Sequence, residues 1–174
     1  RRGLLIEALH HRLAEIDRRR APDDPARDAR VAGLLESARA AVRAFEQSFA
    51  TTEALRRRAR RELGRHTRAD NLCFDPYARI AHATDATDWR VELPFVVLTP
   101  DAEEEVPGLV RACIALGLTV IPRGGGTGYT GSAVPLTPHA AVINVEKLET
   151  VGALETLVLA GLERSVPTLF TGAG

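Results

Sequence analysis

The sequence lacks methionine entirely and has little cysteine, lysine or aromatic residue. Its 174 residues include two cysteines and one tryptophan, and aromatic residues make up 5%. Because no initiator methionine is present, we expect the chain to be a fragment of a longer protein. Sparse cysteine favours a reduced, cytoplasmic setting. No apolar run approaches the roughly 20 residues of a membrane helix, so we expect no membrane span.

The cysteines, Cys73 and Cys113, form no Cys-x-x-Cys pair and lie in no histidine cluster. These spacings predict no metal site and no iron–sulfur cluster in this chain. Cys113 falls on the apolar side of an expected helix and should be buried, whereas Cys73, beside Phe74, should be half-buried. A disulfide between the two remains open from the sequence alone.

Charge is unevenly distributed although the formal net charge is zero. Residues 1–70 carry a net charge of +6 and residues 71–174 a net charge of −6. A basic segment could indicate a nucleic-acid partner. Here, however, the arginines alternate with acidic residues on helical faces, and no aromatic residues lie among them to stack on bases. We therefore expect solvated helix faces and no nucleic-acid partner.

The first 20 residues predict an amphipathic helix from Leu4 to about Arg20, with apolar residues at spacings of three and four. The segment Ala21 to Pro25 should end it. Asp24 followed by Pro25 is typical of a new helix start, with the carboxylate as N-cap and proline in the first turn.

A second amphipathic helix should follow, either continuing through Thr51 and Thr52 or restarting there, and ending near Gly64. Residues 1–64 are therefore expected to form a helical hairpin or bundle without a catalytic constellation. The histidines in and near this region are interpreted as surface residues: His10, His11 and His66.

Residues 65–93 are rich in polar turn formers and are expected to be an ordered connector. Apolar side chains should anchor it, namely Leu72, Phe74, Tyr77, Ile80 and Trp89.

Residues 94–174 have the alternating pattern of short apolar runs and helical periodicity that is typical of an α/β fold. Short apolar runs predict strands at 95–98, 118–121 and 141–145, and residues 154–159 and 166–170 predict a hairpin. The first two strands and the helix between them form a βαβ unit, whose strands should be parallel. Asp101 and Glu104 could form a capping box for that helix, Pro107 should lie in or near its first turn, and Gly117 should be its C-cap.

The loop Arg123-Gly-Gly-Gly-Thr-Gly-Tyr-Thr-Gly131-Ser132 directly follows the second strand. Glycines permit backbone angles that let main-chain N–H groups point into one concavity, which can bind a diphosphate. Hydroxyl groups of Thr127, Thr130 and Ser132 add donors, and Arg123 could add positive charge.

Two other phosphate-binding designs fit less well. A P-loop needs Gly-Lys followed by Ser or Thr, and no lysine lies near these glycines. The dinucleotide fingerprint fits the spacing of Gly126, Gly128 and Gly131, with Glu146 at the ribose-binding distance. That fold requires a helix after the glycines, and residues 132–140 with two prolines are too short for one. A NAD(P)-binding domain is therefore a weaker alternative.

A specific resemblance supports diphosphate binding by loop amides alone. The stretches 94–100, 120–135 and 141–145 resemble the first subdomain of PCMH-type FAD-binding domains in the vanillyl-alcohol oxidase superfamily. They are most similar to the branch of D-lactate dehydrogenases and the glycolate oxidase flavin subunit. Residues 4–13 and 85–91 resemble the N-terminal part of large bacterial FAD/FMN-binding oxidoreductases, which have an uncharacterised N-terminal domain.

The resemblance implies roles for individual residues. The amides of Gly124, Gly125, Gly126, Thr127 and Gly128, with Gly131 and Ser132, would hold the FAD pyrophosphate. Pro100 would line the cofactor site, at the end of the first strand. Some relatives attach flavin through a histidine at the position of Thr127, so FAD should be non-covalent here. The terminal segment 171–174 matches a strand end before a second subdomain.

The sequence thus predicts an α+β protein: a helical region at 1–64, a connector at 65–93 and an incomplete first FAD-binding subdomain at 94–174. The resemblance implies that the parent enzyme oxidises a small 2-hydroxy acid and passes electrons to an acceptor or iron–sulfur module elsewhere. Its catalytic residues would lie beyond Gly174. His139, which follows Pro138 near the loop, is interpreted as a surface turn residue. The rival hypothesis is a non-catalytic helical interaction or assembly module with a vestigial glycine loop.

Overall fold

The computed structural model describes residues 2–20 and 24–174, so the predicted break at residues 21–23 lies outside the described residues. Contacts divide the chain into two compact units, residues 1–56 and 57–174. Helix α2 (Pro25–Leu63) begins in the first unit and ends in the second. The domain limits expected at residues 64 and 93 stay predictions.

The first unit is a helical hairpin of α1 (Arg2–Arg18) and the first part of α2. The predicted N-cap of α2 is confirmed, because the Asp24 carboxylate accepts a hydrogen bond from the Arg27 amide at 3.0 Å. The helix runs without a restart through Thr51 and Thr52. Both helices therefore form as their apolar periodicity predicts.

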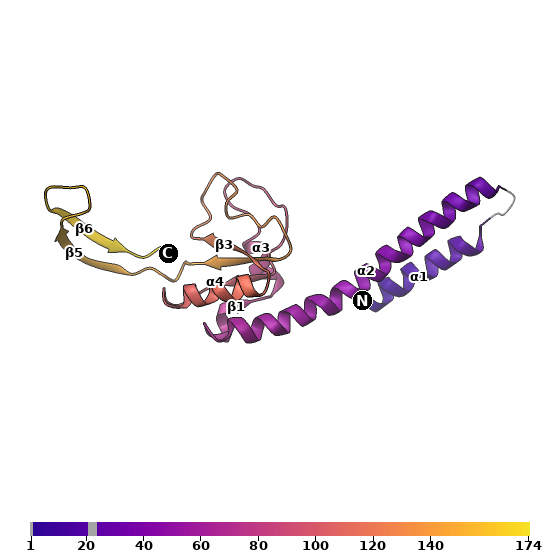
Figure 1. The fold of residues 1–174 in the computed structure, drawn as a ribbon, viewed down its shortest axis with the longest axis horizontal. Coiled ribbons are helices and arrows are strands. Elements are labelled where there is room, and N and C mark those ends of the chain that lie inside the picture. Colours follow the sequence, from indigo (N-terminus) through magenta and orange to yellow (C-terminus); the bar gives the residue numbers. More distant parts are fainter. Residues whose placement is uncertain (1, 21–23) are drawn as a thin grey trace. The chain divides into compact units, whose positions relative to one another are not determined.

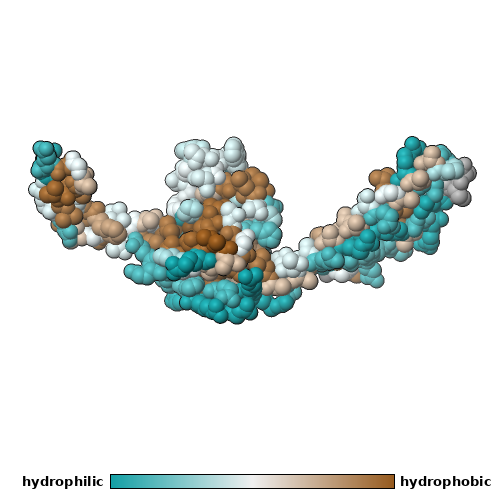
Figure 2. All heavy atoms as spheres, viewed as in Figure 1, coloured by the Kyte–Doolittle hydropathy of each residue, from teal (hydrophilic) through white to brown (hydrophobic). Residues whose placement is uncertain are grey.

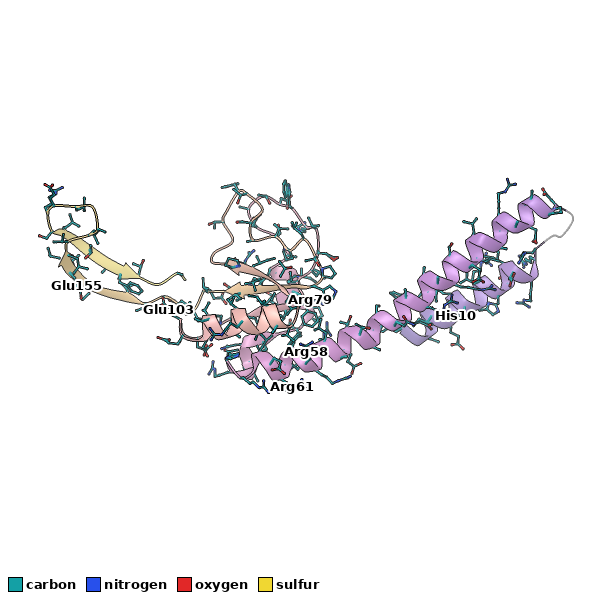
Figure 3. The ribbon with its side chains drawn as sticks, in the orientation of Figure 1. His10, Arg58, Arg61, Arg79, Glu103 and Glu155 are labelled. Carbon is teal, nitrogen blue, oxygen red and sulfur yellow. The ribbon has the colours of Figure 1, made fainter. Side chains whose placement is uncertain are left out.

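Polar contacts join the two helices of this hairpin. Arg39 Nη2 lies 2.7 Å from Asp17 Oδ2, and Figure 3 shows His10 on α1, whose Nε2 lies 3.1 Å from Glu46 Oε1. Leu35 is buried, whereas Leu4 and Leu34 are mostly exposed. The hairpin thus covers only part of its apolar stripe.

The second unit contains a four-stranded sheet in the order β1-β2-β4-β3. Figure 1 labels two of its strands, β1 and β3, together with helices α3 and α4. Its strands are β1 (Leu72–Cys73), β2 (Val96–Leu98), β3 (Thr119–Arg123) and β4 (Ala140–Asn144). β1 is antiparallel to β2, while β2 and β3 both run parallel to β4. The predicted parallel relation of the first two strands is confirmed, but β4 lies between them.

The core lies on the two central strands. Every residue of β2 and β4 is buried, which is typical of parallel strands covered on both faces. Cys113 on α4 (Glu105–Ala115) is fully buried, and α4 packs against β3. Cys73 is half-buried, and both cysteines are free thiols.

The connector is more structured than the sequence predicts. It contains a 3-10 turn η1 (Ala69–Asn71), strand β1 and helix α3 (Pro76–Ala81), which Asp75 caps by accepting a hydrogen bond from the Ala78 amide. Leu72 and Phe74 are buried, as predicted. Tyr77 and Ile80 are wrong as anchors, because both are mostly exposed, whereas Trp89 is 60% exposed but still packs against Gly131.

The start of α4 corrects a second prediction. Glu104 is the N-cap residue but makes no side-chain capping hydrogen bond, so the expected capping box does not form. Instead, the Asp101 amide donates to Glu105 Oε2 at 3.1 Å, while the Asp101 carboxylate binds Asn71 and Lys147. Pro107 lies in the first turn, and Gly117 follows the helix at a φ of 73°, as predicted.

At the other end of α4, Arg58 near the end of α2 donates from Nη2 to the carbonyl of Ala115 at 3.1 Å (Figure 3). A cation at a helix C-terminus can donate a hydrogen bond to a free carbonyl group. It also interacts favourably with the partial negative charge at that end of the helix dipole. This contact joins the end of α2 to the sheet-bearing part of the second unit.

The predicted hairpin is confirmed as β5 (Val151–Leu157) paired antiparallel with β6 (Val166–Thr171). Figure 2 shows hydrophobic side chains gathered over it, and Leu154 and Phe170 are largely exposed. Within the described residues, no helix is long and apolar enough to cross a membrane.

Candidate cofactor-binding site

The glycine loop lies at the carboxyl edge of the parallel strands. β3 ends at Arg123, β2 ends just before Thr99 and Pro100, and β4 ends at Asn144. Because these three strands are parallel, their carboxyl ends meet at one edge, where ligands of open α/β sheets bind. The loop, residues 124–139, returns from β3 to β4 without any helix.

The backbone of the loop uses its glycines where other residues would be strained. Gly126 has a φ of 67° and Gly131 a φ of 72°, both in the left-handed region. The side chain of Ser132 folds back toward Gly128, where a Cβ would lie 3.8 Å from Ser132 Oγ. The loop is therefore curled on itself rather than extended.

The amides of this loop are available to a ligand. In the described part of the chain, no main-chain amide from Gly124 to Ser132 donates a hydrogen bond to another protein group. Most of these residues, among them Gly124, Thr127 and Gly128, are exposed. Unpaired amides at the surface are donors that a phosphate can engage.

The two predicted site residues at the ends of strands are differently placed. Pro100 follows β2 and is fully buried at the carboxyl edge. Arg123 is half-buried, and its Nη1 donates to the main-chain carbonyl of Thr84 at 2.6 Å. Its guanidinium group is thus bound to the connector. The assignment of these residues to a cofactor stays a prediction.

The terminal segment approaches the loop. The amide of Gly174 donates to the Leu148 carbonyl at 3.0 Å, and a Cβ on Gly124 would lie 3.6 Å from the carbonyl oxygen of Ala173. A Cβ on Gly172 would collide with the Leu148 carbonyl, so only glycine fits there. The second glycine segment therefore lies beside the first at the same edge.

A polar network next to this edge was not foreseen from the sequence. The fully buried Asn71 accepts a hydrogen bond from Lys147 Nζ at 2.7 Å and donates to Asp101 Oδ2 at 2.9 Å. Lys147 also lies 2.9 Å from Asp101 Oδ1. Lys147 and then Asn71 hold the pKa of Asp101 below its ordinary value. The signal that could have found it is the single lysine, placed just after a buried strand.

A second missed feature is the segment 84–92, which packs on the loop. A Cβ on Gly131 would lie 3.1 Å from the Trp89 ring, and the Glu92 amide donates to the Pro135 carbonyl at 3.1 Å.

His139, at the end of the loop, is exposed as expected. In the described residues, no group of three or more histidine, cysteine, aspartate or glutamate side chains could hold a metal ion.

Comparisons with known proteins agree on the fold. Two structures of alkyldihydroxyacetonephosphate synthase match 56% of this chain with a TM-score of 0.50, at 25% and 26% identity, covering 20% and 22% of those chains. A structure of p-cresol methylhydroxylase with substrate bound matches 59% of the chain at 17% identity and a TM-score of 0.50, over 20% of its length. The last likeness bears on the fold alone.

The structural neighbours are PCMH-type FAD-binding proteins, which agrees with the resemblance seen in the sequence, and this part of the chain has their fold. A curated D-lactate dehydrogenase from Archaeoglobus fulgidus is 41% identical over 54 residues, which are 31% of this chain and 12% of that protein. The chain is thus related to FAD-linked oxidoreductases. It spans only about an eighth of that curated relative, and no family model matches it.

Proposed function

We propose that this chain carries the diphosphate-binding part of the FAD site in an oxidoreductase that acts on a small 2-hydroxy acid of the D-lactate or glycolate type. One observation carries the proposal: the amides from Gly124 to Ser132 have no acceptor in the described part of the protein and lie in a helix-free turn. The partial likeness to a D-lactate dehydrogenase supports the substrate class.

The loop fits a diphosphate without a lysine. Gly124 to Gly128 supply main-chain donors, the exposed hydroxyl groups of Thr127 and Ser132 add others, and Pro100 closes the neighbouring strand end. Bound FAD would supply the oxidant for the substrate. The chain's own part is to hold and orient the pyrophosphate. The parent enzyme would act in the cytoplasm and pass electrons to an acceptor or iron–sulfur module outside this chain.

Titration of the 174-residue chain tests the site. The emission of Trp89, which packs beside Gly131, serves as the readout. We expect FAD and ADP to bind and adenosine and riboflavin to bind far less, because only the first pair carries a diphosphate. FAD binding should be weak, since contacts to the flavin would come from elsewhere in the enzyme. Equal responses to ADP and adenosine would contradict the proposal and favour a vestigial loop.

The enzyme that contains this chain allows two further tests. It should be yellow when purified, and D-lactate or glycolate should bleach its flavin absorbance in the absence of oxygen. Acid precipitation should release all the flavin into the supernatant, because Thr127 cannot form the bond that a histidine forms. Flavin retained in the protein pellet would contradict non-covalent attachment.

A further inference from the structure

The segment 84–92 contacts the glycine loop at several separate points. Arg123, at the start of the loop, donates to the Thr84 carbonyl, the Trp89 indole packs against Gly131, and the Glu92 amide donates to the carbonyl of Pro135. The segment therefore contacts Arg123, directly before the loop, and two residues within the loop, Gly131 and Pro135.

The Arg123 guanidinium lies directly against the backbone of Gly126. A Cβ on Gly126 would overlap the guanidinium group, so Gly126 leaves room for this side chain as well as adopting a φ of 67°. With Nη1 engaged by the Thr84 carbonyl at 2.6 Å, the side chain links the connector to the left-handed Gly126 of the loop.

Asp85 adds a buried charge to this support. It is 9% exposed, and its Oδ1 accepts hydrogen bonds from the Thr87 amide at 2.9 Å and from the Thr87 hydroxyl. Its Oδ2 is buried without a hydrogen-bond partner of good geometry among the described residues. Thr87, and with smaller effect the Ala133 amide and Arg123, hold the pKa of Asp85 below its ordinary value.

We propose that Arg123 and Asp85 are positioning residues, which fix the glycine loop in its phosphate-binding conformation from the protein side. Arg123 acts through Gly126 and Thr84, and the phosphates are held by uncharged amides. This inference rests on the proposed function. It replaces the simpler idea that Arg123 contributes its charge directly to the ligand.

The two roles of Arg123 differ in their dependence on salt. A direct contact between an exposed cation and a diphosphate is screened as ionic strength rises, so its loss matters most at low salt. A support that acts through loop geometry matters equally at every ionic strength. The affinity for ADP, measured at low and high sodium chloride, therefore separates them.

The experiment compares Arg123→Met, Arg123→Lys and Asp85→Asn, with Arg111→Met on the exposed side of α4 as the charge-matched control. We expect Arg123→Met to weaken ADP binding by about tenfold at both salt concentrations, which the loss of one charge-assisted hydrogen bond can produce. Arg123→Lys should recover part of the affinity by reaching the Thr84 carbonyl, and Arg111→Met should change nothing. A loss confined to low salt, or no loss, would overturn the inference.

A ligand-free measurement separates this inference from the proposed function. The accessibility of Trp89 to acrylamide should rise in Arg123→Met and Asp85→Asn while the far-ultraviolet circular dichroism stays unchanged. If the unaltered chain fails to bind ADP, the proposed function fails, and this measurement still decides whether the support exists. Unchanged accessibility in both variants would overturn it. If Arg123→Met does not fold, Asp85→Asn decides alone.

Discussion

Asn144, the last residue of β4, donates from Nδ2 to His82 Nε2 at 3.0 Å, and His82 Nδ1 in turn donates to the Ala78 carbonyl at 2.8 Å. Asn144 is fully buried and pairs in register with Arg123, the residue that begins the glycine loop. The pair therefore joins helix α3 to the strand end beside the candidate site, with His82 as an acceptor at Nε2.

This relationship predicts a pH-dependent variant. In Asn144→Asp a carboxylate would face the Nε2 lone pair, so His82 must gain a proton to donate. The ion pair between the new carboxylate and a protonated imidazole would stabilise the fold at acidic pH, and this stabilisation would be lost at higher pH, where the imidazole is neutral. We expect the melting temperature of the variant to fall from about pH 5 to pH 8 relative to the unaltered chain. Asn144→Ala, which lacks the carboxylate, is the control, and parallel pH profiles would contradict the assignment.

The glycine loop predicts a loss of flavin without a loss of fold. Valine at Gly126 would adopt a disfavoured φ and overlap the Arg123 guanidinium, whereas a Cβ at Gly128 would make only an ordinary contact, 3.8 Å from Ser132 Oγ, so the Gly126 substitution should carry most of the effect. The double variant Gly126→Val, Gly128→Val should empty the parent enzyme of flavin, as measured by absorbance per polypeptide. Unchanged flavin content would locate the phosphate site elsewhere.

A matched glycine change should have the opposite effect on stability. Gly33 is exposed in the first third of α2, and a Cβ there meets nothing within 4 Å. Alanine restricts the unfolded chain more than glycine, so Gly33→Ala should stabilise the protein by about 0.5–1 kcal/mol in urea unfolding. ADP binding should stay unchanged, and a destabilised variant would contradict the exposed placement.

The network of Asn71, Lys147 and Asp101 predicts a stability contribution at the carboxyl edge. Asn71→Ala would leave Lys147 and Asp101 without their shared amide and should cost about 1–3 kcal/mol of unfolding free energy. The depressed pKa of Asp101 means that its contribution is present at neutral pH and lost as pH falls below about 4. Asp101→Asn should therefore flatten the acid limb of the stability profile. A limb as steep as in the unaltered chain would contradict this.

The two thiols should differ in reactivity. Burial raises the pKa of Cys113 to about 11, and Cys73, whose pKa is raised mainly by desolvation, is half-buried. A chromogenic disulfide reagent at pH 8 should modify Cys73 slowly and Cys113 only after denaturation, because the thiolate is the reactive form. In Cys73→Ser no thiol should react before unfolding. Rapid reaction of that variant would show that α4 opens in the native state.

Much of the local structure follows from the sequence because local chemistry specifies it. Apolar periodicity gives α1 and α2, Asp24 and Pro25 place the start of α2, and Gly117 ends α4. The apolar runs at β2 and β4, the β5–β6 hairpin and the helix-free glycine loop are likewise read from neighbouring residues. The residues that predict each of these features lie within one short stretch of the chain.

Only the tertiary structure decides which distant residues meet. A two-residue strand such as β1 has no pattern of its own and exists because it pairs with β2. Asp101 gives up a capping role because Asn71 and Lys147 reach it across the sheet edge. Arg123 turns to the Thr84 carbonyl, 39 positions away, and the glycine loop gains its support. Hydrogen bonds between remote segments require those segments to be packed side by side, so local sequence determines the elements and packing determines their polar partners.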